Sequence, residues 1–164
     1  SIGAVNTIKF QNGKRIGYNT DHYGFEKSLK PYLNVNHKSA LILGTGGASK
    51  AIAFALKNLN IPFSFVSRIP DSKNCFGYDE LNSKIIAAHK IIINCTPLGT
   101  HPKIELYPPI PYQAISKNHF LYDLIYNPSQ TQFLNFGLKA NATAVNGLKM
   151  LELQAERSWE IWDS

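Results

Sequence analysis

The sequence predicts an α/β fold built on a doubly wound parallel sheet, and two observations support this prediction. First, short apolar runs typical of buried strands alternate along the chain with stretches of helical periodicity. Second, the apolar run at 41–43 leads directly into the glycine-rich sequence GTGG at 44–47 and then into the apolar-periodic stretch AIAFALKNL. A strand, a tight glycine turn and a helix in this order form the first unit of such a fold.

The remaining elements follow from local patterns. The β-like runs 3–8 and 15–18 flank an Asn-Gly pair at 12–13, which predicts a hairpin. Thr20 or Asp21 is expected to cap a helix over 23–33. Further strands are expected at 40–43, 63–67, 91–95, 120–125 and 142–145, and further helices at 48–59, 79–86, 131–138 and from 147 onward.

The glycine-rich turn is also a candidate nucleotide site. Gly44 permits the tight turn, and Gly46 lets the backbone approach a phosphate. The helix that begins near Gly47 and Ala48 offers unpaired N–H groups and a partial positive charge to an anion. An ordinary glycine turn remains the alternative, but the flanking strand and helix favour a Rossmann-like site for a dinucleotide.

The end of the next strand indicates which dinucleotide binds. It ends in Ser67-Arg68, where an NAD site has Asp or Glu for the ribose 2′-hydroxyl, and no carboxylate follows until Asp71. An arginine at this point suits a 2′-phosphate, and its guanidinium plane can stack on adenine. Lys73 is a candidate second cation. The alternative is a solvated arginine at a strand end, but the sequence favours NADP over NAD.

The composition is that of an ordinary globular protein. Hydrophobic residues make up 44% and charged residues 17% of the 164-residue chain, enough for one domain with a substantial core. The net charge of +6 comes from scattered cations rather than from a basic stripe with interleaved aromatic residues. We therefore expect small anionic ligands and no nucleic acid.

The remaining chemistry-bearing residues form no further site. Cys75 and Cys95 have no spacing that suggests a metal site or a disulfide framework, which fits a reducing cytoplasm. No apolar run approaches the roughly 18 residues of a membrane helix, and no signal-peptide pattern opens the chain, so a soluble cytoplasmic protein is expected. Four histidines without the spacing of a metal site are expected to be solvated: His22, His89, His101 and His119.

The last helix has an unusual distribution of apolar residues. One set recurs at helical spacing, while a second set lies off that face, so the helix requires burial nearly all round. The first set is Leu148, Leu151, Ala155, Trp159 and Trp162, and the second is Met150, Leu153 and Ile161. One small sheet is not expected to cover both sets, which indicates packing on another subunit or on a segment outside this chain.

Taken together, the segments resemble shikimate dehydrogenase. The resemblance runs through nearly the whole chain in blocks that keep the family's order: GAVNT (3–7), YNTDHYGF (18–25), LILGTGGASKA (41–51), VSR (66–68), INCTPLGT (93–100), YDLIYNP (122–128) and NGLKMLELQAERSWEIW (146–162). It implies an NADP-dependent oxidoreductase that reduces 3-dehydroshikimate to shikimate, on the route to chorismate and the aromatic amino acids.

The resemblance also implies roles for individual residues on the substrate side. It implies that Asn6 and Gln154 bind the substrate, that Tyr126 lies near it, and that Asp21 is the catalytic carboxylate. From sequence alone Asp21 is equally well explained as a helix cap. A rim position is the alternative for Gln154, a role in the hairpin for Asn6, and an ordinary aromatic at a strand end for Tyr126. The family's catalytic lysine belongs to a segment that this chain does not contain, so no residue here is assigned to it.

On the cofactor side the resemblance extends the glycine turn and Ser67-Arg68 by three residues. Gly147 lies where the family's backbone approaches nicotinamide, Met150 lines that face, and the block at 94–99, which includes Thr96, borders the cofactor cleft. One departure is Ser67-Arg68-Ile69, where the family often has Asn-Arg-Thr, so the resemblance does not carry over every cofactor contact of this segment.

The implied organisation is a Rossmann domain over 22–146, with 1–21 and 147–164 as remnants of a substrate-binding domain whose other part, on the order of 100 residues, precedes this chain. A homodimer is a further expectation. Two other functions stay open: a quinate/shikimate dehydrogenase that accepts NAD, against which Arg68 argues, and a nucleotide-binding module without catalysis.

Overall fold

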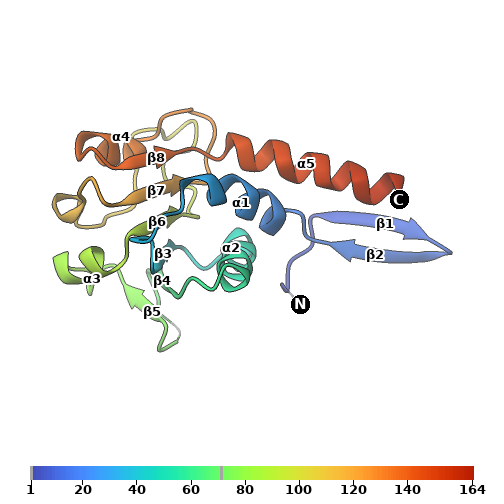
Figure 1. Ribbon diagram of the computed structural model, residues 1–164, viewed down its shortest axis with the longest axis horizontal. Coiled ribbons are helices and arrows are strands. Elements are labelled where there is room, and N and C mark those ends of the chain that lie inside the picture. The colour runs from blue at the N-terminus through green and yellow to red at the C-terminus, as the bar shows by residue number, and fades with distance from the viewer. Residues whose placement is uncertain (1, 71) are drawn as a thin grey trace.

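The computed structural model describes residues 2–70 and 72–164 and contains a six-stranded parallel sheet between two layers of helices (Figure 1). Ser1 and Asp71 lie outside the described residues. The strands of this sheet are β3 (Ala40–Leu43), β4 (Phe63–Ser67), β5 (Cys75–Gly77), β6 (Ile91–Asn94), β7 (Phe120–Asp123) and β8 (Thr143–Val145).

The strand order is β5-β4-β3-β6-β7-β8. Numbered along the chain within this sheet, that is 3-2-1-4-5-6, the order of the dinucleotide-binding Rossmann fold. The chain reverses its direction of winding between β3 and β6, and ligands bind outside the carboxyl ends of the strands at such a point. The predicted fold class is therefore confirmed, and the topology indicates where a site lies.

Helices cover both faces of the sheet. They are α1 (Asp21–Leu29), α2 (Gly47–Asn58), α3 (Ser83–Ala88), α4 (Gln132–Lys139) and α5 (Leu148–Asp163), with short 3₁₀ helices at Lys30–Tyr32 and Tyr112–Ala114. Successive strand residues point to opposite faces. Ala40 and Ile42 therefore join the core under α1 and α2, while Leu41 and Leu43 join the core under α3 and α4.

An antiparallel hairpin of β1 (Thr7–Gln11) and β2 (Lys14–Tyr18) projects from this body (Figure 1). Asn12 and Gly13 both have positive φ, as a two-residue hairpin turn requires. The predicted hairpin is confirmed, but its first strand lies at 7–11 rather than 3–8. The reason is that a two-residue turn pairs Gln11 directly with Lys14, so the strand must continue up to the turn.

Other expectations differ in detail from the structure. The helix expected at 79–86 begins later, because the Asn82 side chain accepts hydrogen bonds from Lys84 N and Ile85 N and so caps α3 there. Thr20 precedes α1, but its side chain makes no capping bond. Strand β5 was not expected, since the three residues Cys-Phe-Gly are too few to show a period.

Two glycines let helices approach their neighbours at backbone distance. A Cβ on Gly24 in α1 would lie 2.5 Å from the Met150 carbonyl oxygen in α5. A Cβ on Gly147, just before α5, would lie 2.0 Å from the Leu124 carbonyl oxygen. Both distances are far below van der Waals contact, so these positions admit only glycine without movement of the backbone. Helix α5 is thereby fixed against both α1 and the turn after β7 (Figure 1).

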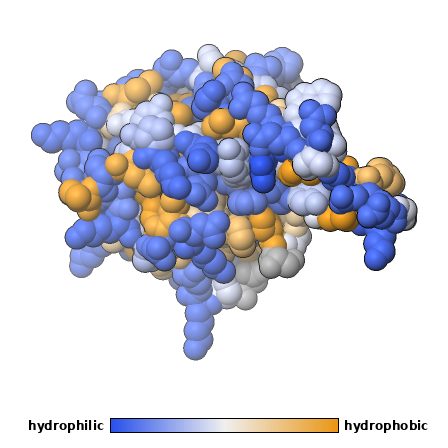
Figure 2. Space-filling view, turned by 45° about the vertical axis from the view of Figure 1, so that its right-hand side comes forward, coloured by the Kyte–Doolittle hydropathy of each residue, from blue (hydrophilic) through white to orange (hydrophobic). Residues whose placement is uncertain are grey.

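Helix α5 turns one of its two apolar sets away from the protein. Met150 and Ile161 are buried together with Ser158, whereas Trp159 is 66% and Trp162 is 49% exposed. Leu148 and Leu151 are exposed as well. The expected exposure of both indoles is confirmed, and the stripe 148-151-155-159-162 faces outward. Elsewhere the face of the molecule seen in Figure 2 is largely polar, with separate apolar patches.

Candidate functional site

A cleft of about 430 Å³ lies at the carboxyl ends of β3, β4, β5 and β6. Each of these strands contributes to it through the residues that follow it: Gly44 and Thr45 after β3, Ser67 and Arg68 at the end of β4, Tyr78 after β5, and Cys95, Thr96, Pro97 and Leu98 after β6. This is the place that the strand order indicates for a ligand.

The glycine turn at 44–47 is shaped to receive a phosphate. Gly44 has a φ of +101°, which L side chains rarely adopt, so the turn itself requires glycine there. A Cβ on Gly46 or Gly47 would meet no atom within 4 Å, so the packing of the protein does not explain these two glycines. Gly46 is the N-cap of α2 and no side chain caps that helix, so its first N–H groups are available to an anion.

The exposed Arg68 side chain borders the same cleft, and no ion pair within the described part of the chain engages it. The Ser67 hydroxyl accepts a hydrogen bond from Ile69 N at 3.2 Å. Across from them, burial raises the pKa of Tyr78 to about 12, although nearby Arg68 opposes the shift. Tyr78 was missed because it follows the unexpected strand β5.

A second cleft, of about 550 Å³, adjoins the first. Cys95, Thr96 and Pro97 line both clefts and form the wall that they share. Ala48 and Tyr126 line the second cleft, as do Leu124 and Ile125 from the turn after β7. The expected cofactor residues Ala48 and Thr96 and the expected substrate residue Tyr126 therefore lie around one cavity.

The other expected substrate-side residues meet in a hydrogen-bonded cluster. Asn6 Nδ2 donates to Asp21 Oδ1 at 2.9 Å and lies 3.5 Å from Gln154 Oε1. Asn6 and Gln154 are 148 positions apart in the chain. Residues before β1, at the start of α1 and in the middle of α5 are thus brought together. The structure does not place this cluster among the residues that line the two clefts.

Three hydroxyl groups hold the cluster and were not identified from the sequence. Thr20 Oγ1 donates to Gln154 Oε1 at 3.1 Å, and Thr20 N donates to Asn6 Oδ1 at 2.8 Å. The Ser158 hydroxyl lies 3.1 Å from that of Thr20 and 2.7 Å from that of Thr7. Ser158 lies one helical turn after Gln154, and residues at this i, i+4 spacing are neighbours on a helix surface. This spacing is the sequence signal that could have placed Ser158 in the cluster.

Asp21 is half-buried at the edge of this cluster. Burial raises the pKa of its carboxyl, while the hydrogen bond from Asn6 and the nearby His22 ring partly oppose that shift. A cap would accept a hydrogen bond from a backbone N–H of its own helix, whereas the recorded partner of Asp21 is the Asn6 side chain. The plain capping interpretation of Asp21 is therefore not supported.

Gly147 and Met150 lie behind the second cleft. Gly147 N donates to the Ile125 carbonyl oxygen at 3.1 Å, and its Cα packs against the Leu124 backbone. The Met150 side chain is buried in the core beneath α1 and α2. Gly147 therefore contacts residues that line the second cleft, whereas Met150 packs α5 onto the core.

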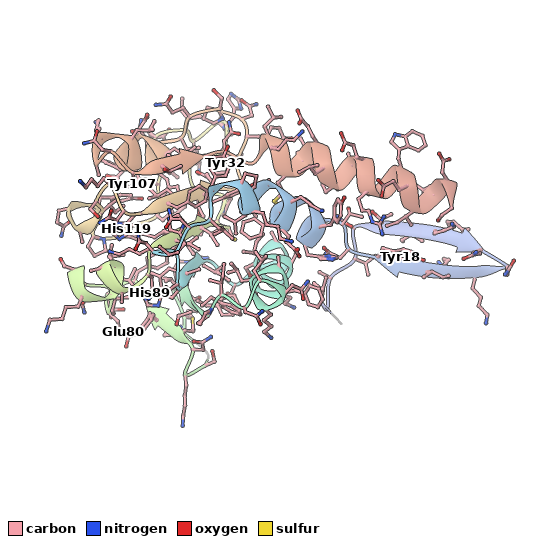
Figure 3. The ribbon with its side chains drawn as sticks, viewed as in Figure 1. Tyr18, Tyr32, Glu80, His89, Tyr107 and His119 are labelled. Atoms are coloured by element: carbon pink, nitrogen blue, oxygen red, sulfur yellow. The ribbon has the colours of Figure 1, made fainter. Side chains whose placement is uncertain are left out.

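The histidines form no site with one another. His89 and His119 precede β6 and β7 and lie on the side of the molecule away from the hairpin (Figure 3). The expectation that the histidines are solvated is wrong for His119, which is buried because its ring lies between Ser116 N and the Ile86 carbonyl oxygen. Within the described ranges no three His, Cys, Asp or Glu side chains are grouped as a metal site requires.

None of the helices described here has both the length and the apolar character needed to cross a membrane.

A scan against protein-family models gives no match. A curated relative, the shikimate dehydrogenase (NADP(+)) of Methanosphaera stadtmanae, is 40% identical over 177 residues, which cover 98% of this chain and 62% of the relative. The chain therefore spans about three fifths of the length of the curated relatives that it matches.

Solved structures agree with this result. A chorismate mutase/shikimate 5-dehydrogenase fusion protein from Clostridium acetobutylicum matches 99% of this chain and 60% of its own, with a TM-score of 0.85 and 38% identity. The shikimate 5-dehydrogenase of Thermus thermophilus, solved in complex with NADP(H) and shikimate, matches 98% of this chain and 62% of its own, with a TM-score of 0.84 and 28% identity.

Proposed function

Because the chain is related in sequence and fold to the shikimate dehydrogenases along nearly its whole length, we propose that it is the cofactor-binding part of an NADP-dependent shikimate dehydrogenase. The activity is the reversible reduction of 3-dehydroshikimate to shikimate, and shikimate with 3-dehydroshikimate are its small-molecule partners. Since the relatives are longer, we assign this activity to a longer protein to which the chain contributes.

The convergence of Asn6, Asp21 and Gln154 carries this proposal. Each was assigned to the substrate side from a separate sequence block, and the three come together although up to 148 positions separate them. A nucleotide-binding module without catalysis has no need for this cluster beside a Rossmann fold. The amides of Asn6 and Gln154 are suited to bind substrate hydroxyl groups.

The cleft fits NADP. Gly46 and Gly47 leave room where a side chain would block a phosphate, α2 begins without a side-chain cap, and Arg68 is exposed at the rim. When bound, the nicotinamide ring supplies the hydride or accepts it. We assign Gly44, Gly46, Gly47 and Ala48 to the pyrophosphate, Ser67 and Arg68 to the 2′-phosphate end, and Thr96 and Gly147 to the nicotinamide side, where Met150 contributes from the core beneath α5.

Asp21 carries the acid–base role that the reaction requires of this chain. Reduction of a ketone leaves an oxygen that must receive a proton, and oxidation of the alcohol must release one. The Asp21 carboxylate, held by Asn6 Nδ2 at 2.9 Å, is positioned to orient a proton donor that comes from the preceding part of the longer protein. Asn6, Gln154 and Tyr126 then bind and orient the substrate.

The domain assignment follows as a further proposal. We assign 22–146 to the Rossmann domain and 1–21 together with 147–164 to the substrate-binding domain, because the hairpin and α5 project together from one side of the sheet (Figure 1). A cytoplasmic location is proposed on the small number of cysteines and on the biosynthetic relatives.

Arg68→Ala is expected to remove most of a preference for NADP⁺ over NAD⁺. A charge-assisted hydrogen bond to a phosphate contributes about 1.5–3 kcal/mol, which corresponds to roughly tenfold to a hundredfold in affinity. Titration calorimetry with both cofactors measures the preference. Arg15→Ala is the matched control, because it removes one positive charge from an exposed position in the hairpin. Equal affinities of the unchanged chain for the two cofactors would favour the quinate/shikimate alternative.

Self-association of the isolated chain is expected through the exposed stripe of α5. Trp159 and Trp162 are large, exposed and edge-on to each other, with ring centroids 5.7 Å apart, so a second copy gains apolar burial by covering them. We therefore propose a homodimer of this chain. Light scattering across a concentration series should show it, and Trp159→Gln should shift it toward monomer. A chain that stays monomeric at every concentration would rule it out.

A further inference from the structure

The carboxyl ends of β6 and β7 hold a buried carboxylate that has no role in the proposed chemistry. Asp123 and Asn94 are the last residues of these neighbouring strands, pair in register, and are both fully buried. Asp123 has no ion-pair partner among the described residues. An unpaired buried carboxylate is costly, so its retention requires a reason.

Hydrogen-bond donors surround both oxygens of this carboxylate. Asp123 Oδ1 accepts from Asn94 Nδ2 at 3.0 Å and from Ile125 N at 3.1 Å. Asp123 Oδ2 accepts from Thr131 Oγ1 at 2.6 Å, and that threonine caps α4 through Leu134 N. Burial raises the pKa of Asp123 to about 6, and these three donors oppose the shift.

Because the Asp123 carboxylate accepts from Asn94 Nδ2, the oxygen of the Asn94 amide must point the other way. That oxygen accepts from Thr96 N at 3.0 Å and from Thr96 Oγ1 at 2.7 Å. Thr96 belongs to the wall that the two clefts share. Its methyl group lies 3.2 Å from the place a Cβ on Gly44 would occupy, so it also packs over the glycine turn.

On the basis of the proposed cofactor site, we propose that Asp123 is a positioning residue for NADP binding: it fixes the direction of the Asn94 amide, which holds Thr96 at the wall between the two clefts. Asp123 itself lines neither cleft. Its effect on the cofactor passes through the hydrogen bond from Asn94 Nδ2 to Asp123 and the two hydrogen bonds from Thr96 to Asn94 Oδ1.

The need for an acceptor at position 123 gives a specific test. Asp123→Ala removes that acceptor, so nothing fixes the direction of the Asn94 amide. In Asp123→Asn the amide oxygen can take the place of Oδ1 and accept from Asn94 Nδ2 and Ile125 N, while the new amide nitrogen donates to the Thr131 hydroxyl. Asp123→Asn therefore keeps the direction of the Asn94 amide without the charge.

Two measurements separately test the hydrogen-bonded link from Asp123 through Asn94 to Thr96. Hydrogen exchange of the Thr96 amide in the cofactor-free chain is expected to accelerate about tenfold in Asp123→Ala and to return to within about threefold of the original rate in Asp123→Asn. The affinity for NADP⁺ is expected to weaken about tenfold and to recover in the same way.

Ser28→Ala is the matched control for a merely structural effect. The Ser28 hydroxyl lies 2.7 Å from that of Tyr122, which is buried next to Asp123 on β7 but faces the opposite side of the sheet. Its loss should lower the melting temperature without changing the affinity for NADP⁺ or the exchange of Thr96.

Each outcome decides the inference. Unchanged Thr96 exchange in Asp123→Ala, or exchange in Asp123→Asn as fast as in Asp123→Ala, overturns it. If Asp123→Ala does not fold, Asn94→Ala, which removes the amide between Asp123 and Thr96, decides the question: faster Thr96 exchange supports the inference, and unchanged exchange overturns it. An original chain that binds no NADP⁺ refutes the proposed function instead, while the exchange experiment still tests the link from Asp123 to Thr96.

Discussion

Shikimate oxidation by the 164-residue chain alone is expected to be negligible, at least about 10²–10⁴-fold slower than by a longer protein that includes the preceding substrate-binding segment. The chain offers Asp21 as the carboxylate, but the proton donor that Asp21 would orient is assigned to that segment. The other part of the substrate-binding domain is assigned there too, and with it part of the orientation that makes hydride transfer fast. The absorbance of NADPH, followed with shikimate and NADP⁺ supplied, measures the rate.

Asp21→Asn in the longer protein is the matched comparison. An amide at this position can still accept the hydrogen bond from Asn6, so the geometry is retained while the charge is removed, and we expect about 10²–10⁴ of the rate to be lost. Robust turnover by the isolated chain that Asp21→Asn abolishes would show that another donor in this sequence replaces the missing one.

Gly147→Ala is expected to destabilise the fold by about 3 kcal/mol or more. The added methyl group would lie 2.0 Å from the Leu124 carbonyl oxygen, and both partners in that clash are backbone, so no side-chain rotation relieves it. For a chain of this size the melting temperature should fall by roughly 6–12 °C. Thermal unfolding followed by circular dichroism gives the shift.

Gly46→Ala provides the control for Gly147→Ala. A Cβ at position 46 meets nothing within 4 Å and the backbone φ is −73°, so stability should change by no more than about 0.5 kcal/mol. The affinity for NADP⁺ should nevertheless fall, because the methyl group fills space that we assign to the pyrophosphate. Equal stabilities for the two alanine variants would contradict the steric argument at Gly147.

The sequence was sufficient to predict the sheet because its strands are short apolar runs with recognisable ends. The run at 41–43 and the following glycines identified β3 and α2 almost to the residue. Strand β5 was not predicted, because three residues are too few to show an alternation of apolar and polar side chains. Tyr78, which follows it, was missed for the same reason. Local patterns also do not tell which apolar set of α5 faces inward, since that depends on the close approach at Gly24.

Much less of the site could be predicted from local chemistry. Asn6, Asp21 and Gln154 came from the resemblance to a family, because no pattern in the sequence reports a contact across 148 positions. Thr20, Ser158 and the Asp123–Asn94 pair were missed for a related reason. Their roles depend on which donor faces which acceptor across separate elements, and that becomes visible only in three dimensions.

The glycine contact between α1 and α5 sets the distance between the two helices. Because no side chain lies between Gly24 and the Met150 carbonyl, any larger residue at position 24 would push α5 away from α1. Helix α5 contacts the hairpin at its far end through Trp162 Nε1 and the Ile8 carbonyl oxygen, and it begins at Gly147, against the turn after β7. One helix therefore connects the hairpin to the border of the second cleft, and its position depends on two glycines.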